Sequence, residues 1–225
     1  MAETSLHFHE HQQGNMALAL PPLPIHPRIV LAPVRWETYQ ALLQDVTDHS
    51  HVRMTYDQGT LELMAPSYAH EETNRILAMI VEAIALGQGR DLQPAGSTTF
   101  TSAQLARGFE PDSCYYFTHA ATVRGQAIID LALDPPPELV IEVDMTRASL
   151  NKLPLYAAVG VGEVWRYDGT HVLIYTLAGT RYTAVPASTV LAPITSQQLT
   201  TWLRQQRELP YPAWVQMMQA QIRSR

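Results

Sequence analysis

The chain has 225 residues, of which 46% are hydrophobic and 16% are charged, and its formal net charge at pH 7 is −6. A chain of this length and composition folds as one domain or as one domain with extensions, and no apolar run reaches the roughly 20 residues that cross a bilayer. The negative charge argues against constitutive, tight binding to nucleic acid, because the field of the whole molecule repels phosphates.

The N-terminus and the single cysteine predict a cytoplasmic protein. The first residues lack the basic-then-apolar order of a signal peptide, and one cysteine cannot form an internal disulfide. Residues 1–27 are polar and proline-rich, with histidines at alternate positions from His7 to His11, which favours a flexible tail over a metal site. We place this tail at 1–27, the main domain at 28–208 and a C-terminal extension at 209–225.

The first half of the main domain predicts a helix, a hairpin and a second helix. Residues 32–49 are amphipathic, and residues 51–66 alternate apolar and polar side chains around a turn at Gly59. The second helix begins near Ser67 and runs to about Gly87, with isoleucines at four-residue spacing that predict one buried stripe.

The first turn of this second helix carries a His-Glu pair, His70 and Glu71. The helical zinc-protease motif needs another histidine four residues after the first, but that position is Asn74, so a zinc site is excluded here. We expect His70 to pack near the buried stripe and Glu71 to complement the positive end of the helix dipole.

The second half alternates strands and helices. Residues 113–119 and 138–144 predict strands, and the second of these, "ELVIEVD", is apolar enough for the centre of a sheet. Residues 150–162 predict a helix, 163–185 predict further strands, and 195–208 predict a closing helix. Helices interspersed among strands indicate a mixed α/β domain built around one sheet.

Two segments place acidic residues on or beside strands. "RGFEPDSCYYF" puts Asp112 just before a strand, and alternation along "ELVIEVD" puts Glu142 and Asp144 on one face. Neighbouring carboxylates repel, so a cation or basic groups must compensate them. Mg²⁺, which prefers oxygen ligands, is one candidate. The alternative is structural: Asp112 as turn chemistry, Asp144 at a strand end and Glu142 paired with an arginine.

Lys152 lies just beyond the acidic strand. Because Pro154 is tolerated only in the first helical turn, Asn151 is the predicted N-cap and Lys152 the first helical residue. An ammonium there could reach a phosphate at the site; the alternative is an exposed surface lysine.

Several blocks, in order and with compatible gaps, resemble the Uma-two family of restriction-endonuclease-like bacterial proteins. They are "YDQGTLELMAPSYAHEETNRIL", "RGFEPDSCYYF" and "DPPPELVIEVDMTRASLNKLPLYAAVGVGEVWRYDG". The resemblance spans residues 30–205 and implies the PD-(D/E)XK nuclease superfamily, whose restriction-endonuclease-like core is a mixed sheet flanked by helices.

The resemblance also implies roles for particular residues. Asp112 and Glu142 match the two acids that would bind Mg²⁺ or Mn²⁺. The superfamily's usual lysine stands two residues after the second acid, where this chain has Asp144, so Lys152 is the implied replacement. Asp144 would be a further metal ligand or would position water, and Glu71 matches an acid that the family often carries beside the helix histidine.

The implied function is a metal-dependent DNA endonuclease that hydrolyses phosphodiester bonds with Mg²⁺ or Mn²⁺. Two alternatives stay open: a catalytically silent nucleic-acid-binding or assembly protein on the same scaffold, and a metal-dependent hydrolase of a smaller phosphodiester. DNA is the expected partner, no membrane is expected, and a homodimer would allow both strands to be cut.

Overall fold

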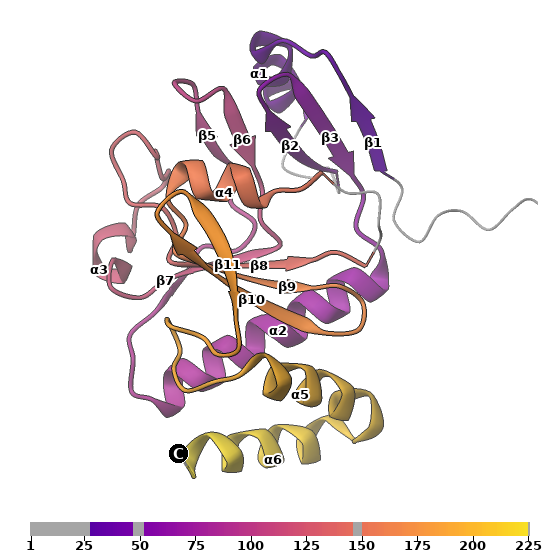
Figure 1. The fold of residues 1–225 in the computed structure, drawn as a ribbon, viewed down its shortest axis with the longest axis vertical. Coiled ribbons are helices and arrows are strands. Elements are labelled where there is room, and N and C mark those ends of the chain that lie inside the picture. The colour runs from indigo at the N-terminus through magenta and orange to yellow at the C-terminus, as the bar shows by residue number, and fades with distance from the viewer. Residues whose placement is uncertain (1–27, 47–51, 146–149, 225) are drawn as a thin grey trace, which may run out of the picture.

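The computed structural model describes residues 28–46, 52–145 and 150–224, so the predicted tail lies outside the described residues. Within this part of the chain, the strands form two sheets and the helices lie mainly around the larger one (Figure 1). None of the described helices is both long and apolar enough to cross a membrane.

The first sheet has five strands in the order β1-β3-β2-β6-β5. Their bounds are β1 Arg28–Leu31, β2 Arg53–Asp57, β3 Thr60–Met64, β5 Phe100–Ser102 and β6 Arg107–Phe109. Helix α1, Trp36–Asp45, covers one face, where Tyr39 packs with Met54, Tyr56 and Leu61. The opposite face carries Arg53 and Glu62, which contact Asp112 and the Leu150 backbone.

The second sheet has six strands in the order β11-β10-β9-β8-β7-β4, and all neighbouring strands are antiparallel except β8 and β9. Their bounds are β4 Gln93–Pro94, β7 Ser113–Tyr116, β8 Leu139–Val143, β9 Glu163–Tyr167, β10 Val172–Ala178 and β11 Arg181–Val185. The fully buried β8 lies between β7 and β9, as its apolar sequence predicts.

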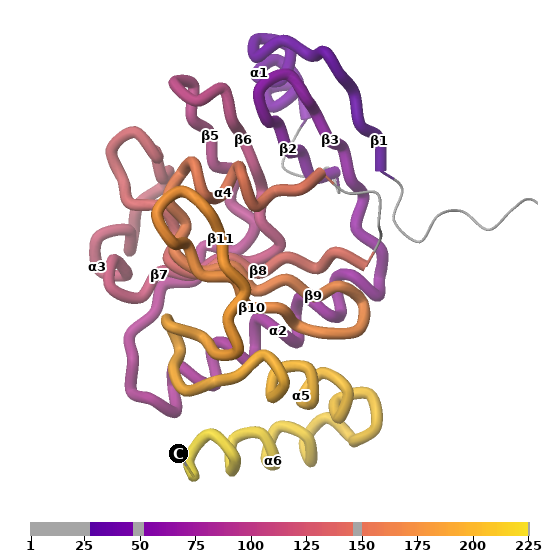
Figure 2. Tube along the Cα trace, in the orientation of Figure 1, coloured from indigo at the N-terminus to yellow at the C-terminus, as the bar shows by residue number. Residues whose placement is uncertain are grey.

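The remaining helices cover the second sheet. They are α2 Tyr68–Gly87, α3 Ala120–Val123, α4 Leu153–Val159, α5 Ser196–Glu208 and α6 Tyr211–Arg223. Helices α2, α5 and α6 share a core with one face of β8, whereas α4 packs on the other face (Figure 1). The chain path in Figure 2 runs from β3 into α2, which crosses beneath the second sheet and so joins the two sheets.

The alternation of β8 is confirmed. Leu139, Ile141 and Val143 belong to the core with α2, α5 and α6, and Val140 belongs to the core with α4. The face that Val140 shares with Glu142 therefore meets the side on which α4 lies.

The hairpin and the second helix of the first half are confirmed, whereas the helix predicted at 32–49 begins only at Trp36, and the number of sheets differs from the expectation. Gln58 and Gly59 both have positive φ, 45° and 101°, as a two-residue hairpin turn requires. Ser67 caps α2, its side chain accepting a hydrogen bond from the His70 backbone. The single predicted sheet is instead two, because β6 returns to pair with the β2–β3 hairpin, a long-range pairing that local pattern does not encode.

Candidate functional site

The site lies where the starts of α2 and α4 approach the adjacent strands β7 and β8. In the antiparallel register, Ser113 of β7 pairs with Ile141 of β8. Continuing that register by one residue places Asp112 opposite Glu142. The two acids from separate segments are therefore brought together, as the sequence predicts.

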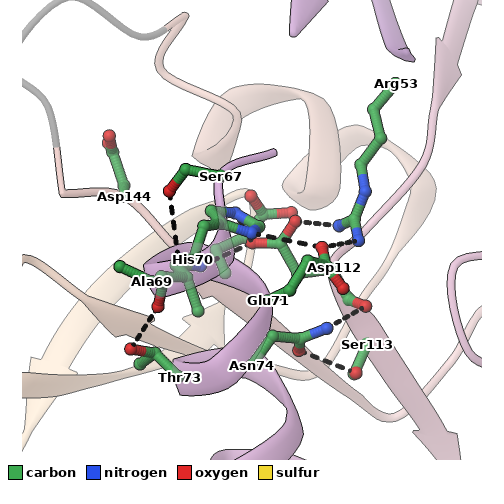
Figure 3. A network of polar contacts seen from close by, with 12 residues as sticks. Arg53, Ser67, Ala69, His70, Glu71, Thr73, Asn74, Asp112, Ser113 and Asp144 are labelled. Carbon is green, nitrogen blue, oxygen red and sulfur yellow. Dashed lines mark hydrogen bonds and ion pairs between the residues drawn. The ribbon is translucent and has the colours of Figure 1, made fainter. Parts of the chain in front are cut away.

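Asp112 is buried, 2% exposed, and is held by groups from three directions (Figure 3). Its Oδ1 pairs with a guanidinium nitrogen of Arg53 from the first sheet. Its Oδ2 accepts a hydrogen bond from the Val143 backbone N–H at 2.6 Å and lies 3.1 Å from Nε2 of His70. The carboxylate is therefore fixed in position by both sheets and by α2.

These partners keep Asp112 ionised. Burial alone would raise the pKa of this carboxyl, but the hydrogen bond and charge of His70 and the charge of Arg53 outweigh burial and lower the pKa to about 2. A carboxylate is therefore present at neutral pH, in a position from which water is nearly excluded.

We expect Asp112→Asn to destabilise the metal-free protein at neutral pH. The folded-state pKa lies below the unfolded value of 3.8, so the charge stabilises the fold above that value and the effect is lost as pH falls through about 2. The shift corresponds to about 2 kcal/mol at pH 7. Urea unfolding in a chelator should show a difference between variant and parent that shrinks from neutral pH to about pH 3. A pH-independent difference would contradict this explanation.

Glu71 reaches the same cluster through Arg53. Its Oε1 accepts a hydrogen bond from Arg53 Nη2 at 2.8 Å and lies 3.4 Å from His70 Nδ1, while its side chain remains 44% exposed. Arg53 thus bridges Glu71 and Asp112. His70 is fully buried, as its place beside the apolar stripe predicts.

Asn74, the residue that excludes the zinc motif, has a structural role. Its side-chain amide donates to the Asp112 backbone carbonyl at 3.0 Å, and its side-chain oxygen accepts from Ser113 Oγ at 2.9 Å (Figure 3). This buried pair of hydrogen bonds ties α2 to the segment that carries Asp112.

Helix α4 holds both oxygens of Glu142. Lys152 Nζ donates to Oε2 at 2.8 Å, and the Tyr156 hydroxyl donates to Oε1. Burial raises the pKa of Glu142 more than the Lys152 charge lowers it, and the charge of Asp112 raises it further. Burial would lower the pKa of Lys152, but the charges of Glu142 and Asp112 outweigh this and raise it.

Lys152 is not a surface lysine, since its side chain is only 11% exposed. The predicted capping is shifted by one residue: α4 begins at Leu153, and Lys152 occupies the N-cap position without a side-chain cap of its own. Asn151 still contributes, because its Oδ1 accepts a hydrogen bond from the Leu153 backbone at 3.3 Å.

Asp144 is compensated separately. Arg166 of β9 donates to its Oδ2 at 2.5 Å, and Arg28 of β1 lies 3.6 Å from its Oδ1. Asp144 and Glu142 both line a cavity of about 20 Å³, which is large enough for one water molecule.

The expected convergence of three carboxylates into one metal site is not found. Within the described ranges, no three His, Cys, Asp or Glu side chains are grouped to hold a metal ion. Asp112, Glu142 and Asp144 instead each face a cationic partner supplied by the protein. Asp112 and Glu142 nonetheless fit the preference of Mg²⁺, which commonly takes one or two carboxylates and keeps several waters.

Sequence reasoning missed Arg53, Tyr156 and Arg166, although each has a local signal. Tyr156 follows Lys152 by four residues, so the two share a helix face. Alternation along β2 puts Arg53 on the face away from the buried Met54. Alternation along β9 puts Arg166 on the same face of the second sheet as Glu142.

A further signal is compositional. Lys152 is the only lysine in the chain, and the other 14 residues of the Lys-plus-Arg total of 15 are arginines. This single lysine is the residue that pairs with Glu142.

The chain matches one family of known proteins over most of its length. Residues 36–211 match the Uma2 family, described as "Putative restriction endonuclease". The chain belongs to the Uma2 family. The resemblance noted in the sequence is thus confirmed, and the Uma2 match includes every residue of the site except Arg28.

A solved structure supports the fold of this Uma2 protein. A crystal structure titled as a putative nuclease belonging to DUF820, from Anabaena variabilis ATCC 29413, is similar with a TM-score of 0.54. The match has 11% sequence identity and covers 76% of this chain and 99% of that chain, so it confirms the mixed α/β fold. No curated protein matches the chain.

Proposed function

We propose that this Uma2 protein is a metal-dependent DNA endonuclease, with Asp112 and Glu142 as the ligands of Mg²⁺ or Mn²⁺ and Lys152 as the catalytic cation. One observation carries the proposal: two acids oppose each other at neighbouring strands, and the chain's only lysine lies 2.8 Å from one of them. This arrangement of two acids and a lysine is suited to phosphodiester hydrolysis.

The side chains divide the work as follows. A divalent cation, when bound, supplies polarisation of the phosphodiester and a more acidic water. Lys152 offsets the negative charge that grows on the phosphoryl oxygens, as a preorganised cation in a site from which water is largely excluded. Tyr156 fixes the orientation of Glu142, and His70 and Arg53 hold Asp112 ionised.

Glu71 and Asp144 have supporting roles in this proposal. Glu71 acts through Arg53, because it binds the guanidinium that also pairs with Asp112. Asp144 stands where the superfamily has its lysine, and its pairing with Arg166 suits a positioning role better than direct metal binding.

The test is cleavage of supercoiled plasmid DNA. We expect nicked or linear product with Mg²⁺ or Mn²⁺ and none with EDTA. Linear product at early times would support a homodimer that cuts both strands, whereas nicked circles would indicate one site acting alone. Absence of cleavage of duplex and single-stranded DNA with either metal would overturn the proposal.

One observation favours a second function, a catalytically silent nucleic-acid-binding or assembly protein. The three acids are already matched by Arg53, Lys152 and Arg166, so the fold does not need a metal ion to balance them. Binding of DNA without cleavage in any metal would favour this second function.

A further inference from the structure

Arg28 reaches the site from outside the segment that matches the Uma2 family. It opens β1, the edge strand of the first sheet, and pairs in register with Met64. Its side chain is nevertheless only 9% exposed, because it extends towards Asp144, beyond the end of β8 in the second sheet.

The guanidinium of Arg28 has long contacts. Its Nη1 lies 3.5 Å from Glu62 Oε2 and its Nη2 lies 3.6 Å from Asp144 Oδ1, both beyond a good N–H···O hydrogen bond. Among the described residues, Nε and Nη1 have no hydrogen-bond acceptor. Buried polar groups normally have partners, so these donors are a marked exception.

The two nearby carboxylates have shorter bonds to other donors. Glu62 Oε2 accepts from the Leu150 backbone N–H at 2.8 Å, and Asp144 Oδ2 accepts from Arg166 at 2.5 Å. These acids lie beside the Arg28 guanidinium but leave its Nε and Nη1 without an acceptor among the described residues.

Arg28 also lines the cavity of about 20 Å³ beside Glu142. Lys152 and Arg166 line the same cavity together with the carboxylates of Glu142 and Asp144. Three cations and two acids therefore surround a space that admits one oxygen-sized group. The cavity adjoins the Glu142–Lys152 pair, where the reaction is proposed to occur.

We propose that Arg28 binds a non-bridging phosphate oxygen of the nucleic-acid backbone, on a phosphate next to the one that is cleaved. A guanidinium offers several N–H donors in a planar fork that matches phosphate oxygens, and two of these nitrogens have no acceptor among the described residues. This assignment rests on the proposed nuclease function. It adds to it a substrate-binding residue from the first sheet.

The test is the salt dependence of DNA binding by Arg28→Gln. Binding of a labelled duplex is measured by fluorescence anisotropy with EDTA and with Ca²⁺ in place of Mg²⁺, across a range of NaCl concentrations. Losing one phosphate contact should weaken binding roughly tenfold at low salt and reduce the slope of log K against log salt by about one.

Arg204→Gln is the matched control, since it removes the same charge from an exposed position on α5. Arg28→Lys keeps the charge but loses the fork, so it should retain the slope and bind less tightly than the parent. It also replaces Arg28→Gln if that variant fails to fold, as judged by circular dichroism.

The outcomes separate the two proposals. Equal binding and equal slopes for Arg28→Gln and Arg204→Gln, with DNA binding intact, would overturn the role of Arg28 and leave the nuclease proposal standing. The same conclusion follows if Arg28→Gln changes only thermal stability. No DNA binding by the parent in either condition would overturn both.

Discussion

Glu142→Gln is expected to lower the rate of metal-dependent DNA cleavage by at least a hundredfold while the protein remains folded. A Lewis-acidic ion contributes several kcal/mol to such a reaction, and about 1.4 kcal/mol corresponds to a factor of ten in rate. The glutamine can keep both partners, because its amide oxygen can accept from Lys152 and its amide N–H can donate to the Tyr156 hydroxyl, so the loss is one of charge rather than of packing. Plasmid cleavage measures the rate, Mg²⁺ calorimetry measures metal binding, and thermal melting checks that the variant is folded.

Glutamine is a better substitution here than alanine. Removing the whole side chain would leave Lys152 buried without its partner, a change that typically costs about 3–5 kcal/mol. Asp91→Asn, on an exposed carboxylate paired with Arg124, is a control that removes one negative charge far from the acids. Cleavage by Glu142→Gln at the parent rate would refute the site assignment.

Lys152→Met is expected to reduce cleavage about a hundred- to a thousandfold, the usual effect of removing one preorganised charge-stabilising group. Methionine matches the length of the lysine stem, so packing of α4 should survive. In the parent, the charge of Lys152 lowers the pKa of Glu142, so removing that charge should raise the pKa of Glu142 further. Cleavage rates from pH 6 to 9 and metal affinity at each pH would measure both effects.

Lys152→Arg separates charge from shape. An arginine keeps the positive charge but has a larger, planar head group that does not fit an 11% exposed position made for an ammonium. Partial activity in Lys152→Arg with little in Lys152→Met would support a role for charge. Equal activity in the parent, Lys152→Met and Lys152→Arg would show that this lysine takes no part in the reaction.

The parts of the site that depend on local periodicity were predictable from sequence. A period of two in "ELVIEVD" puts Glu142 on the face towards α4, and Pro154 fixes the start of that helix to within one residue. The adjacency of Asp112 and Glu142 also follows once their strands are recognised as neighbours.

The cationic half of the site was not predictable in the same way. Arg53 meets Asp112 across 59 residues of sequence, and this contact depends on how the two sheets are placed. Arg28 begins a four-residue strand after a proline-rich leader, where no periodic pattern marks it. The sequence shows the carboxylates but not their cationic partners, so it indicates a metal site more strongly than the folded structure does.

Two of the cations at the site come from a different sheet than the acids they face. Asp112, Glu142 and Asp144 belong to the second sheet or its edges, while Arg53 and Arg28 come from the first. A chimaera that takes its first 64 residues from a relative would therefore inherit Asp112 and Asp144 from one parent and Arg53 and Arg28 from the other. Exchange of this segment between Uma2 proteins is constrained by charge matching across the seam, even where the backbones superimpose.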